Sequence, residues 1–589
     1  MSARFSRRFF KSLMIAGASV AIGIGAAQYA QAESVVGPTN PSLKMAALPF
    51  ANIGENRIIR TEIATKLSSG SVDGRTFRNP DAMQAAYAGR NGEPLWIGRS
   101  GAADHIADFI TVLEESWTHG LNPEQYHLTQ IKTLAGSDSP QDRAHLDLLI
   151  SDAVMRYGQD VTGMRVAPDR IRQKAEYWRQ PMAAGDVLMQ VSASDDPADM
   201  LEDLAPQGSL YDRLRDELVT LSRSPERAAE EAGPVNFGGG LLRPGEYHKN
   251  VPKLRARMGQ THDPMYGPEN LYDDELAAAV MKFQAQHGLS ADGVLGPKTL
   301  AFMNQSVRDK MEQIIVNLER LRWLEQEKPH RYILVNIPSA TLWAVEGNSV
   351  EAQMPVIVGR KDRPTKSFTT EITGIRFNPK WNVPTTIKTK DYLPRLKEDP
   401  YYLQDKGIEV YRVIEGRRET VDPASVDWAN MTRSDLARLN MQQGAGDNNA
   451  LGRIRVLMPN QYDIYLHDTN SPGLFANNDR TLSSGCVRMA DPEKVARFIL
   501  GPNPGWSDER MHGLIARGST SEVKAEEKLP VYFLYQTVWL DNRGQLVYGP
   551  DIYSEDQRLL SVLKDMKAYA IPDRDGVKFA AISQNPIVQ

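Results

Sequence analysis

The hydrophobic periodicity of this chain changes near residue 330. Before that point apolar residues recur at helical spacing, as in 146–157 and 311–324. After it, short runs rich in β-branched and aromatic residues, such as 331–337 and 340–345, are separated by turn formers, a pattern typical of strands. A chain of 589 residues is too long for one hydrophobic core. The sequence therefore predicts a multidomain α+β protein, with a mainly helical N-terminal part and a mixed β domain after it.

The first 32 residues have the pattern of a signal peptide. Arg7 and Arg8 belong to a positive region, 13–27 is apolar, and Ala-Gln-Ala at 30–32 offers a small-residue cleavage site. The apolar run is shorter than the roughly 18–20 residues of a membrane-spanning helix, so we expect cleavage and no integral membrane segment afterwards. Export by the Sec route is expected, and the twin arginines leave the Tat route open.

Charge and cysteine content narrow the function further. The net charge of −5 and the pI of about 6.1 give no support for nucleic-acid binding. Cys486 is the only cysteine, so the chain has no intrachain disulfide. In an exported protein a single thiol without a partner is better explained by chemistry than by packing. We find no metal-ligand cluster, phosphate loop or nucleotide motif, so no cofactor or metal is predicted.

A candidate base lies 19 residues before Cys486. Residues 463–466 read as a strand with His467 at its C-terminal end, and a loop rich in turn formers follows. Two neighbouring strands joined by that loop would bring His467 close to Cys486, and a thiol needs such a neighbour to react as thiolate. Ser484 and Gly485 are small, as a loop that holds an oxyanion with backbone amides requires. The alternative is that Cys486 is a buried hydrophobic residue without a role in chemistry.

The residues around His467 and Cys486 favour the catalytic interpretation. His-Asp-Thr from His467 and Ser-Ser-Gly-Cys-Val-Arg from Ser483 resemble the active-site motif of the YkuD-type L,D-transpeptidases, cysteine enzymes that cross-link peptidoglycan. Histidine precedes cysteine, the reverse of the order in NlpC-type and papain-type peptidases. The resemblance implies Cys486 as nucleophile, His467 as base, and Ser484 and Gly485 in the oxyanion loop. Many family members carry a second histidine where this chain has Ser484.

Four further residues are candidates for substrate binding. They are Arg488, Trp381, Asn382 and Tyr465. For Arg488 a structural salt bridge is an equally open interpretation. Asn-Pro-x-Trp-Asn-Val-Pro from Asn378 resembles the YcbB-like branch of the family, which also implies a capping insertion over the active site.

The resemblance extends along the chain and gives a domain division. Ala-Val-x-x-Phe-Gln from Ala279 and Asp-Gly-Val-x-Gly from Asp292 resemble the peptidoglycan-binding domain of wall enzymes, a small three-helix fold. The predicted parts are a signal peptide at 1–32, a helical scaffold and linker at 33–245, the peptidoglycan-binding domain at 246–306, a connecting helix at 307–325, a catalytic domain at 326–525 with a capping insertion at 391–440, and a C-terminal strand and helix extension at 526–589.

The family reaction implies the function. Cys486 would take the acyl group of a tetrapeptide stem, release D-alanine and pass the acyl group to an amine on another stem, giving a 3→3 cross-link. The expected partners are peptidoglycan stem peptides and proteins of cell-wall synthesis, the expected location is the periplasm, and carbapenems are expected to acylate Cys486. The sequence leaves open an L,D-carboxypeptidase or hydrolase on the same scaffold, and a non-catalytic wall-binding scaffold.

Overall fold

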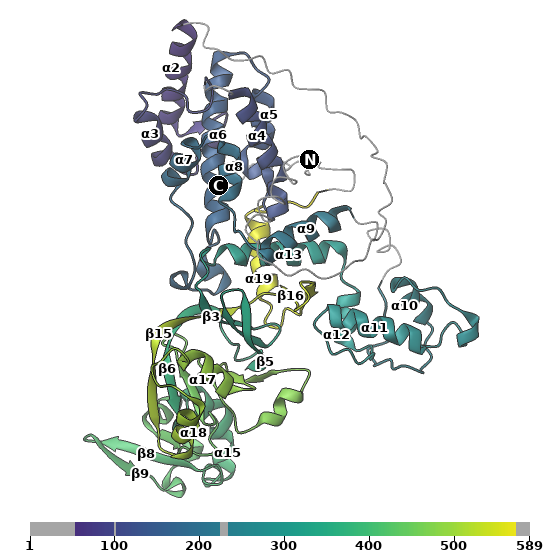
Figure 1. Ribbon diagram of the computed structural model, residues 1–589, viewed down its shortest axis with the longest axis vertical. Helices are drawn as coiled ribbons and strands as arrows, with labels where there is room; N and C mark the ends of the chain where they lie inside the picture. The colour runs from purple at the N-terminus through teal and green to yellow at the C-terminus, as the bar shows by residue number, and fades with distance from the viewer. Residues whose placement is uncertain (1–52, 99–101, 224–233, 573–589) are drawn as a thin grey trace. The chain divides into compact units, whose positions relative to one another are not determined.

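The computed structural model describes residues 53–98, 102–223 and 234–572. All of them lie in one compact unit, Ala47–Gln589, to which everything below refers. The predicted signal peptide at 1–32 lies outside the described residues. The multidomain α+β class is confirmed: helices fill the N-terminal part, and a large mixed sheet follows (Figure 1).

The N-terminal part consists of helices, of which α2, α5, α7 and α8 contact α6 and α9 contacts α13 (Val307–Arg322). Their bounds are α2 (Ile53–Ser69), α3 (Pro80–Ala88), α4 (Ala102–Glu115), α5 (Leu128–Leu134), α6 (Pro140–Thr162), α7 (Ala184–Ser192), α8 (Pro197–Asp203) and α9 (Ser209–Arg223), with the short strands β1 (Ser71–Val72) and β2 (Arg75–Thr76) after α2. Asp147 of α6 is fully buried, and its carboxylate accepts hydrogen bonds from the amides of residues 95–97 and from the Tyr87 hydroxyl. A buried carboxylate needs such partners, which fix the loop before α4 against α6.

The predicted peptidoglycan-binding domain contains three helices, α10 (Val251–Arg257), α11 (Asp274–Gln286) and α12 (Pro297–Met303). Leu254, Leu276 and Val280 lie in its core. Gln284 holds the Asp292–Gly293 turn, because its side chain donates to the Asp292 carboxylate at 2.9 Å and accepts from the Gly293 amide at 2.9 Å. The glycine-rich turn is therefore fixed to α11 rather than free.

The connecting helix α13 (Val307–Arg322) is buried along most of its length. Ser306 and Asp309 form a capping box at its start. Glu319 accepts a hydrogen bond from Arg165 of the scaffold at 2.8 Å, and Asn317 donates to Thr537 at 2.7 Å. The helix thus joins the scaffold to the C-terminal hairpin and helix, which are β16 (Val538–Leu540), β17 (Leu546–Tyr548) and α19 (Glu555–Asp565).

The catalytic region is built on a nine-stranded mixed sheet. In spatial order its strands are β13 (Thr481–Ser483), β5 (Ser349–Gly359), β14 (Val487–Met489), β12 (Leu466–His467), β11 (Ile454–Leu457), β6 (Phe368–Phe377), β15 (Ser521–Leu534), β3 (Arg331–Asn336) and β4 (Thr341–Glu346). The first part of β5 also pairs with β4, so the sheet curls back on itself around one apolar core. Two helices, α17 (Pro492–Leu500) and α18 (Asp508–Ala516), contribute apolar residues to that core. The predicted domain boundary at 525/526 lies inside β15, because 529–533 pair with β6 and 531–534 with β3.

A smaller subdomain follows β6. Its four-stranded sheet has the order β7 (Trp381–Asn382), β10 (Asn440–Gln443), β8 (Ile408–Ile414) and β9 (Arg417–Thr420), and its helices are α14 (Thr385–Ile387), α15 (Leu393–Glu398) and α16 (Arg433–Arg438). Figure 1 shows β8 and β9 as a hairpin. We call this subdomain the cap. Its separate apolar core runs from Trp381 to Leu451, so the cap is wider at both ends than the predicted 391–440, because β7 and β10 must pair to complete its sheet.

Candidate active site

The register of two short strands places Cys486 and His467 on the same face of the sheet. β12 runs parallel to β14, with Leu466 opposite Val487 and His467 opposite Arg488. Leu466 and Val487 point into the apolar core, so His467 and Arg488 point to the other face. The Val487 amide donates to the Tyr465 carbonyl, which continues the ladder by one residue. By the same alternation Tyr465 and Cys486 lie on the face of His467, and Cys486 is its diagonal neighbour.

His467 has one ring nitrogen in use and one available. Its Nδ1 lies 2.5 Å from the Asp468 carbonyl oxygen, and because a carbonyl can only accept, Nδ1 carries the proton. Nε2 is then the unprotonated nitrogen that can take a proton from a thiol. Burial lowers the pKa of His467 to about 3, helped by the nearby Arg488 guanidinium, so the imidazole is neutral at neutral pH.

The backbone that orients His467 is fixed by the Asp468 side chain. Its carboxylate accepts from the Arg453 amide at 2.7 Å and from the Thr469 amide at 2.6 Å. Burial raises the pKa of Asp468, and these two amides oppose that effect. Gly452 packs directly on the carboxyl group, since a Cβ atom at Gly452 would lie 2.3 Å from Asp468 Cγ. Asp468 is therefore a positioning residue for the base.

Cys486 is partly exposed and its thiol is neutral in the free protein. Its Sγ lies 3.8 Å from the Asp463 carbonyl oxygen, to which the S–H group can donate. Burial raises the pKa of the Cys486 thiol above its ordinary value. Within the described part of the chain no hydrogen bond joins Cys486 to His467. Catalytic hydrogen bonds are often long or poorly aligned without substrate.

The loop before Cys486 is held by hydrogen bonds from its own Ser483 and from Thr365. The Ser483 hydroxyl donates to the Cys486 carbonyl at 2.6 Å and accepts from the Gly485 amide at 3.1 Å. Thr365 donates to the Gly485 carbonyl at 2.8 Å. Gly485 has φ 118, in the region that favours glycine. Because the Gly485 amide already has a partner, the amides of Ser484 and Cys486 are the better placed candidates for an oxyanion.

Arg363 joins this loop to the cap, a connection that sequence reasoning missed. Its Nη1 donates to the Ser484 hydroxyl at 3.0 Å, and its Nη2 donates to the Asp391 carboxylate at 2.7 Å. Nη1 also contacts the second carboxylate oxygen of Asp391. Asp391 belongs to the short helical segment η8 (Lys388–Tyr392) at the start of the cap. Arg363 is 8% exposed, so this bidentate pair is largely shielded from water.

Trp381 and Asn382, predicted to line the cleft, lie in the cap sheet. Trp381 is 8% exposed and belongs to the apolar core of the cap. Asn382 accepts a hydrogen bond from Gln442 of the neighbouring strand at 2.7 Å. Their positions support the cap sheet and give neither a direct place beside Cys486. Tyr465 differs, because it packs against the apolar cores of both the cap and the catalytic sheet.

Two arginines flank His467 across the sheet. Arg488 is its partner on β14, and Arg455 is its partner on β11. The Arg455 guanidinium lies 4.0 Å from the centre of the Tyr465 ring, and the rings of Tyr465 and His467 are 5.6 Å apart. No described carboxylate forms an ion pair with either arginine, and the Nε atom of each is buried without a hydrogen-bond partner. Among the described residues Arg488 has no salt bridge, so its substrate-binding role stays a prediction, and Arg455 was not foreseen.

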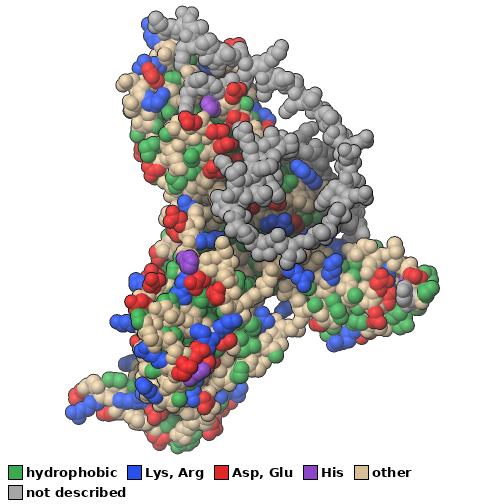
Figure 2. Space-filling view, in the orientation of Figure 1, with side chains coloured by type: hydrophobic (Ala, Val, Ile, Leu, Met, Phe, Trp, Pro, Cys, Tyr) green, Lys and Arg blue, Asp and Glu red, His purple; other side chains and the backbone are tan. Residues whose placement is uncertain are grey.

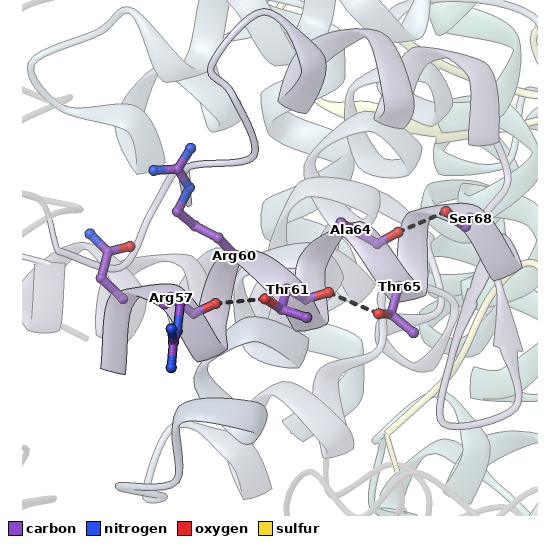
Figure 3. A pocket seen from close by; sticks show the side chains of 7 residues that line it. Arg57, Arg60, Thr61, Ala64, Thr65 and Ser68 are labelled. Carbon is purple, nitrogen blue, oxygen red and sulfur yellow. Dashed lines mark hydrogen bonds between the residues drawn. The ribbon is translucent and has the colours of Figure 1, made fainter. Parts of the chain in front are cut away.

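A hollow on the surface of α2 is unrelated to this site. Its lining runs from Asn56 to Ser68 along one helix (Figure 3). The hydroxyls of Thr61, Thr65 and Ser68 each donate to the carbonyl one turn before them. These three hydroxyls are thus satisfied by the helix itself, and none of the predicted catalytic residues lines the hollow.

Three domain families match successive parts of the chain. Residues 81–218 match a scaffold domain, 256–303 match the "Putative peptidoglycan binding domain", and 330–523 match the L,D-transpeptidase catalytic domain of the YkuD family. The last two confirm the predicted family resemblance. The search of the described residues finds no helix long and apolar enough to cross a membrane.

One curated relative supports the match of 330–523 to the catalytic domain. A "Putative L,D-transpeptidase" of Haemophilus influenzae (strain ATCC 51907 / DSM 11121 / KW20 / Rd) is 34% identical over 248 residues, which cover 42% of this chain and 49% of the relative. The chain thus spans about half the length of this curated relative. A solved structure of a fused Zn-dependent amidase/peptidase/peptidoglycan-binding domain-containing protein from Clostridium acetobutylicum ATCC 824 is 11% identical, over 50% of this chain and 100% of that one. Its TM-score of 0.14 is too low to indicate a shared fold. Residues 330–523 of this chain therefore belong to the YkuD family of L,D-transpeptidase catalytic domains.

Proposed function

We propose that this protein is a periplasmic peptidoglycan L,D-transpeptidase that forms 3→3 cross-links by cysteine acyl transfer. The observation that supports the proposal is the β12–β14 register, which makes Cys486 a diagonal neighbour of His467, together with the Nδ1 hydrogen bond that leaves Nε2 of the histidine unprotonated. The match of 256–303 to a peptidoglycan-binding domain supports the wall as substrate. The signal-peptide pattern at 1–32 supports export to the periplasm.

The first half-reaction forms a thioester. His467 Nε2 takes the Cys486 proton, and the thiolate attacks the carbonyl carbon between the third stem residue and the D-alanine that follows it. Backbone amides of Ser484 and Cys486 stabilise the negative oxygen of the tetrahedral intermediate. When the intermediate collapses, the carbon–nitrogen bond breaks and the imidazolium gives its proton to the departing amine. The products are free D-alanine and an acyl-enzyme.

The second half-reaction forms the cross-link. An amine of a neighbouring stem attacks the thioester carbonyl, His467 takes its proton, and the proton returns to the sulfur as the thiolate leaves. One amide bond is broken and one is formed, so the cycle needs no oxidant or cofactor. Water would give a tripeptide instead. Tyr465 packs against the core of the cap, and closure of the cap over bound substrate would limit water and favour the amine as acceptor.

The test combines product analysis with intact-protein mass. Purified mature protein is incubated with disaccharide-tetrapeptide, and the wild type is compared with Cys486→Ala. We expect cross-linked dimers and free D-alanine from the wild type, a transient acyl-enzyme mass, and none of these from the variant. Tripeptide without dimers would instead establish the hydrolase.

Carbapenem gives an independent reading of the nucleophile. A strained β-lactam amide should acylate Cys486 in the folded wild type and leave Cys486→Ala without an adduct. A wild-type protein with neither turnover nor adduct would refute the enzyme and leave the wall-binding scaffold.

A further inference from the structure

We propose that Arg455 and Arg488 together bind the terminal carboxylate of the D-alanine that leaves the donor stem. This inference rests on the proposed function, because it assigns a specificity-determining pair to the same site. The two arginines would make the protein select stems that end one residue after the broken bond.

The position of the pair is set by the sheet. Arg455 on β11 and Arg488 on β14 are the direct neighbours of His467 on either side. Neighbouring strands lie about 4.8 Å apart, so both guanidinium groups extend over the face that carries the histidine and Cys486. Arg455 is held there by stacking on Tyr465, with its guanidinium carbon 4.0 Å from the ring centre.

The pair lacks an anion. Both side chains are partly buried, each has a buried Nε without a partner, and no described carboxylate forms an ion pair with either. The nearby carboxylates have other partners. Asp468 accepts hydrogen bonds from two backbone amides. Glu522 pairs with Arg376, the residue opposite Arg455 on β6. Two partly desolvated guanidinium groups without a counter-charge are unfavourable unless a ligand supplies one.

The reaction supplies a carboxylate at this place. His467 must give its proton to the nitrogen of the departing D-alanine, so that nitrogen has to lie beside the imidazole. A single carbon atom separates the nitrogen from the carboxylate of the same alanine. The carboxylate therefore has to lie within one residue's reach of His467, where Arg455 and Arg488 are its only described cationic neighbours on the adjacent strands. Guanidinium is the side chain best suited to grip a carboxylate with two parallel hydrogen bonds.

Binding at this pair would also prepare the base. Arg488, and more weakly Arg455, contribute to the low pKa of His467, because positive charges disfavour the imidazolium. A bound carboxylate cancels part of that charge, so the pKa of His467 rises once the donor is in place. Proton transfer from Cys486 is then easier with the donor bound than in the free protein.

The experiment compares enzyme variants on two donors that differ only in the charge of the terminal group. Acyl-enzyme formation is followed with disaccharide-tetrapeptide ending in a free carboxylate and with the same donor ending in an amide. The variants are Arg455→Gln and Arg488→Gln, with Arg455→Lys to restore the charge. Arg376→Gln is the matched control, since Arg376 lies on the same row but is paired with Glu522 at 2.7 Å.

We expect wild type to prefer the acid donor by about 10- to 100-fold in kcat/KM, the range of one charge-assisted contact pair. Each glutamine variant should lose about 10-fold with the acid donor and lose less with the amide, so that its preference for the acid donor over the amide shrinks. Arg455→Lys should recover part of the loss, and Arg376→Gln should match wild type. Equal losses with both donors would overturn the proposal and assign the arginines to structure or to the thiolate.

A binding measurement separates this proposal from the proposed function. Cys486→Ala, which cannot turn over, is titrated by calorimetry with the acid and amide donors, alone and combined with Arg455→Gln. Tighter binding of the acid that disappears with Arg455→Gln supports the carboxylate site even if wild type forms no cross-links. Equal binding of both donors refutes the site even if wild type is an active transpeptidase.

Discussion

The contact between Arg363 and Asp391 should decide whether the cap and the catalytic loop act together. Arg363 donates two charge-assisted hydrogen bonds to Asp391 at the start of the cap and one to Ser484 beside Cys486. We predict that Asp391→Asn and Arg363→Gln both loosen the cap and slow the acylation of Cys486. Their effects should be strongly coupled, because each substitution breaks the same pair.

The size of the coupling follows from the exposure of the pair. Hydrogen bonds to charged groups contribute roughly 1.5–3 kcal/mol each when shielded, whereas exposed ion pairs contribute about 0.2–1 kcal/mol. The Arg363 side chain is 6% exposed and that of Asp391 is 32% exposed, so the pair lies between these limits. We expect a coupling free energy of about 2 kcal/mol, which corresponds to about a 30-fold change in the local opening equilibrium.

Amide hydrogen exchange in the full chain measures this coupling. The exchange of the amides of α15, which follows Asp391 directly, is compared for wild type, both single variants and the double variant. Carbapenem acylation of Cys486 is followed in parallel. Arg395→Gln is the control, because Arg395 and Glu398 form an exposed pair at 3.7 Å in the same helix and should contribute little.

The pH dependence gives a second check on the same pair. The hydrogen bond from Arg363 holds the pKa of Asp391 below its ordinary value of 3.8. A carboxyl group with a lowered pKa stabilises the folded state above its unfolded-state pKa, and this contribution is lost as pH falls through the folded-state pKa. A coupling below about 0.5 kcal/mol at neutral pH, or additive effects no larger than those of Arg395→Gln, would refute the reasoning.

Three further outcomes test other parts of the site. Gly452→Ala should destabilise the protein by about 1–3 kcal/mol and slow acylation, because its Cβ would meet the Asp468 carboxyl group. Thermal unfolding and the acylation rate measure the two effects. Gly444→Ala is the control, because a Cβ at Gly444 would have nothing within 4 Å. His467, with its pKa lowered to about 3, should show no titration by NMR between about pH 5 and pH 8. The free energy of unfolding should fall as pH drops below 6.5, because the unfolded chain then binds a proton that the folded protein does not. A titration midpoint of His467 near 6.5 would contradict its burial. Trp381→Ala should cost about 3–5 kcal/mol of cap stability, seen as faster amide exchange in β8 with β15 unchanged, whereas equal protection of β8 would show that Trp381 is not a core residue of the cap.

Charged side chains of both signs are mixed on one face of the molecule. On the face shown in Figure 2, acidic and basic side chains are intermingled over the described residues. This mixture agrees with the small net charge of −5. Arg455 and Arg488 beside His467 have no ion-pair partner among the described residues, and the Nε atom of each is buried without a hydrogen-bond partner.

Local patterns in the sequence determined much of the architecture. The change of period near residue 330 predicted the helical part and the mixed β domain, since side-chain spacing follows helix and strand geometry directly. The connecting helix predicted at 307–325 is α13, which ends at Arg322. The His467 and Cys486 motifs indicated the catalytic domain family, and the strand predicted at 463–466 is observed as the shorter β12, which ends at His467.

Only the tertiary structure decided which distant side chains meet at the site. Arg363 and Asp391 are 28 residues apart, and Arg455 meets His467 across two strands, so no local spacing connects them. The sequence motif predicts Trp381 as a cleft residue, but the pairing of β7 with β10 places it in the core of the cap. The boundary at 525/526 failed because β15 is one long strand shared by two neighbours. Sequence patterns report local backbone preference, whereas register and long-range pairing depend on how the whole sheet closes.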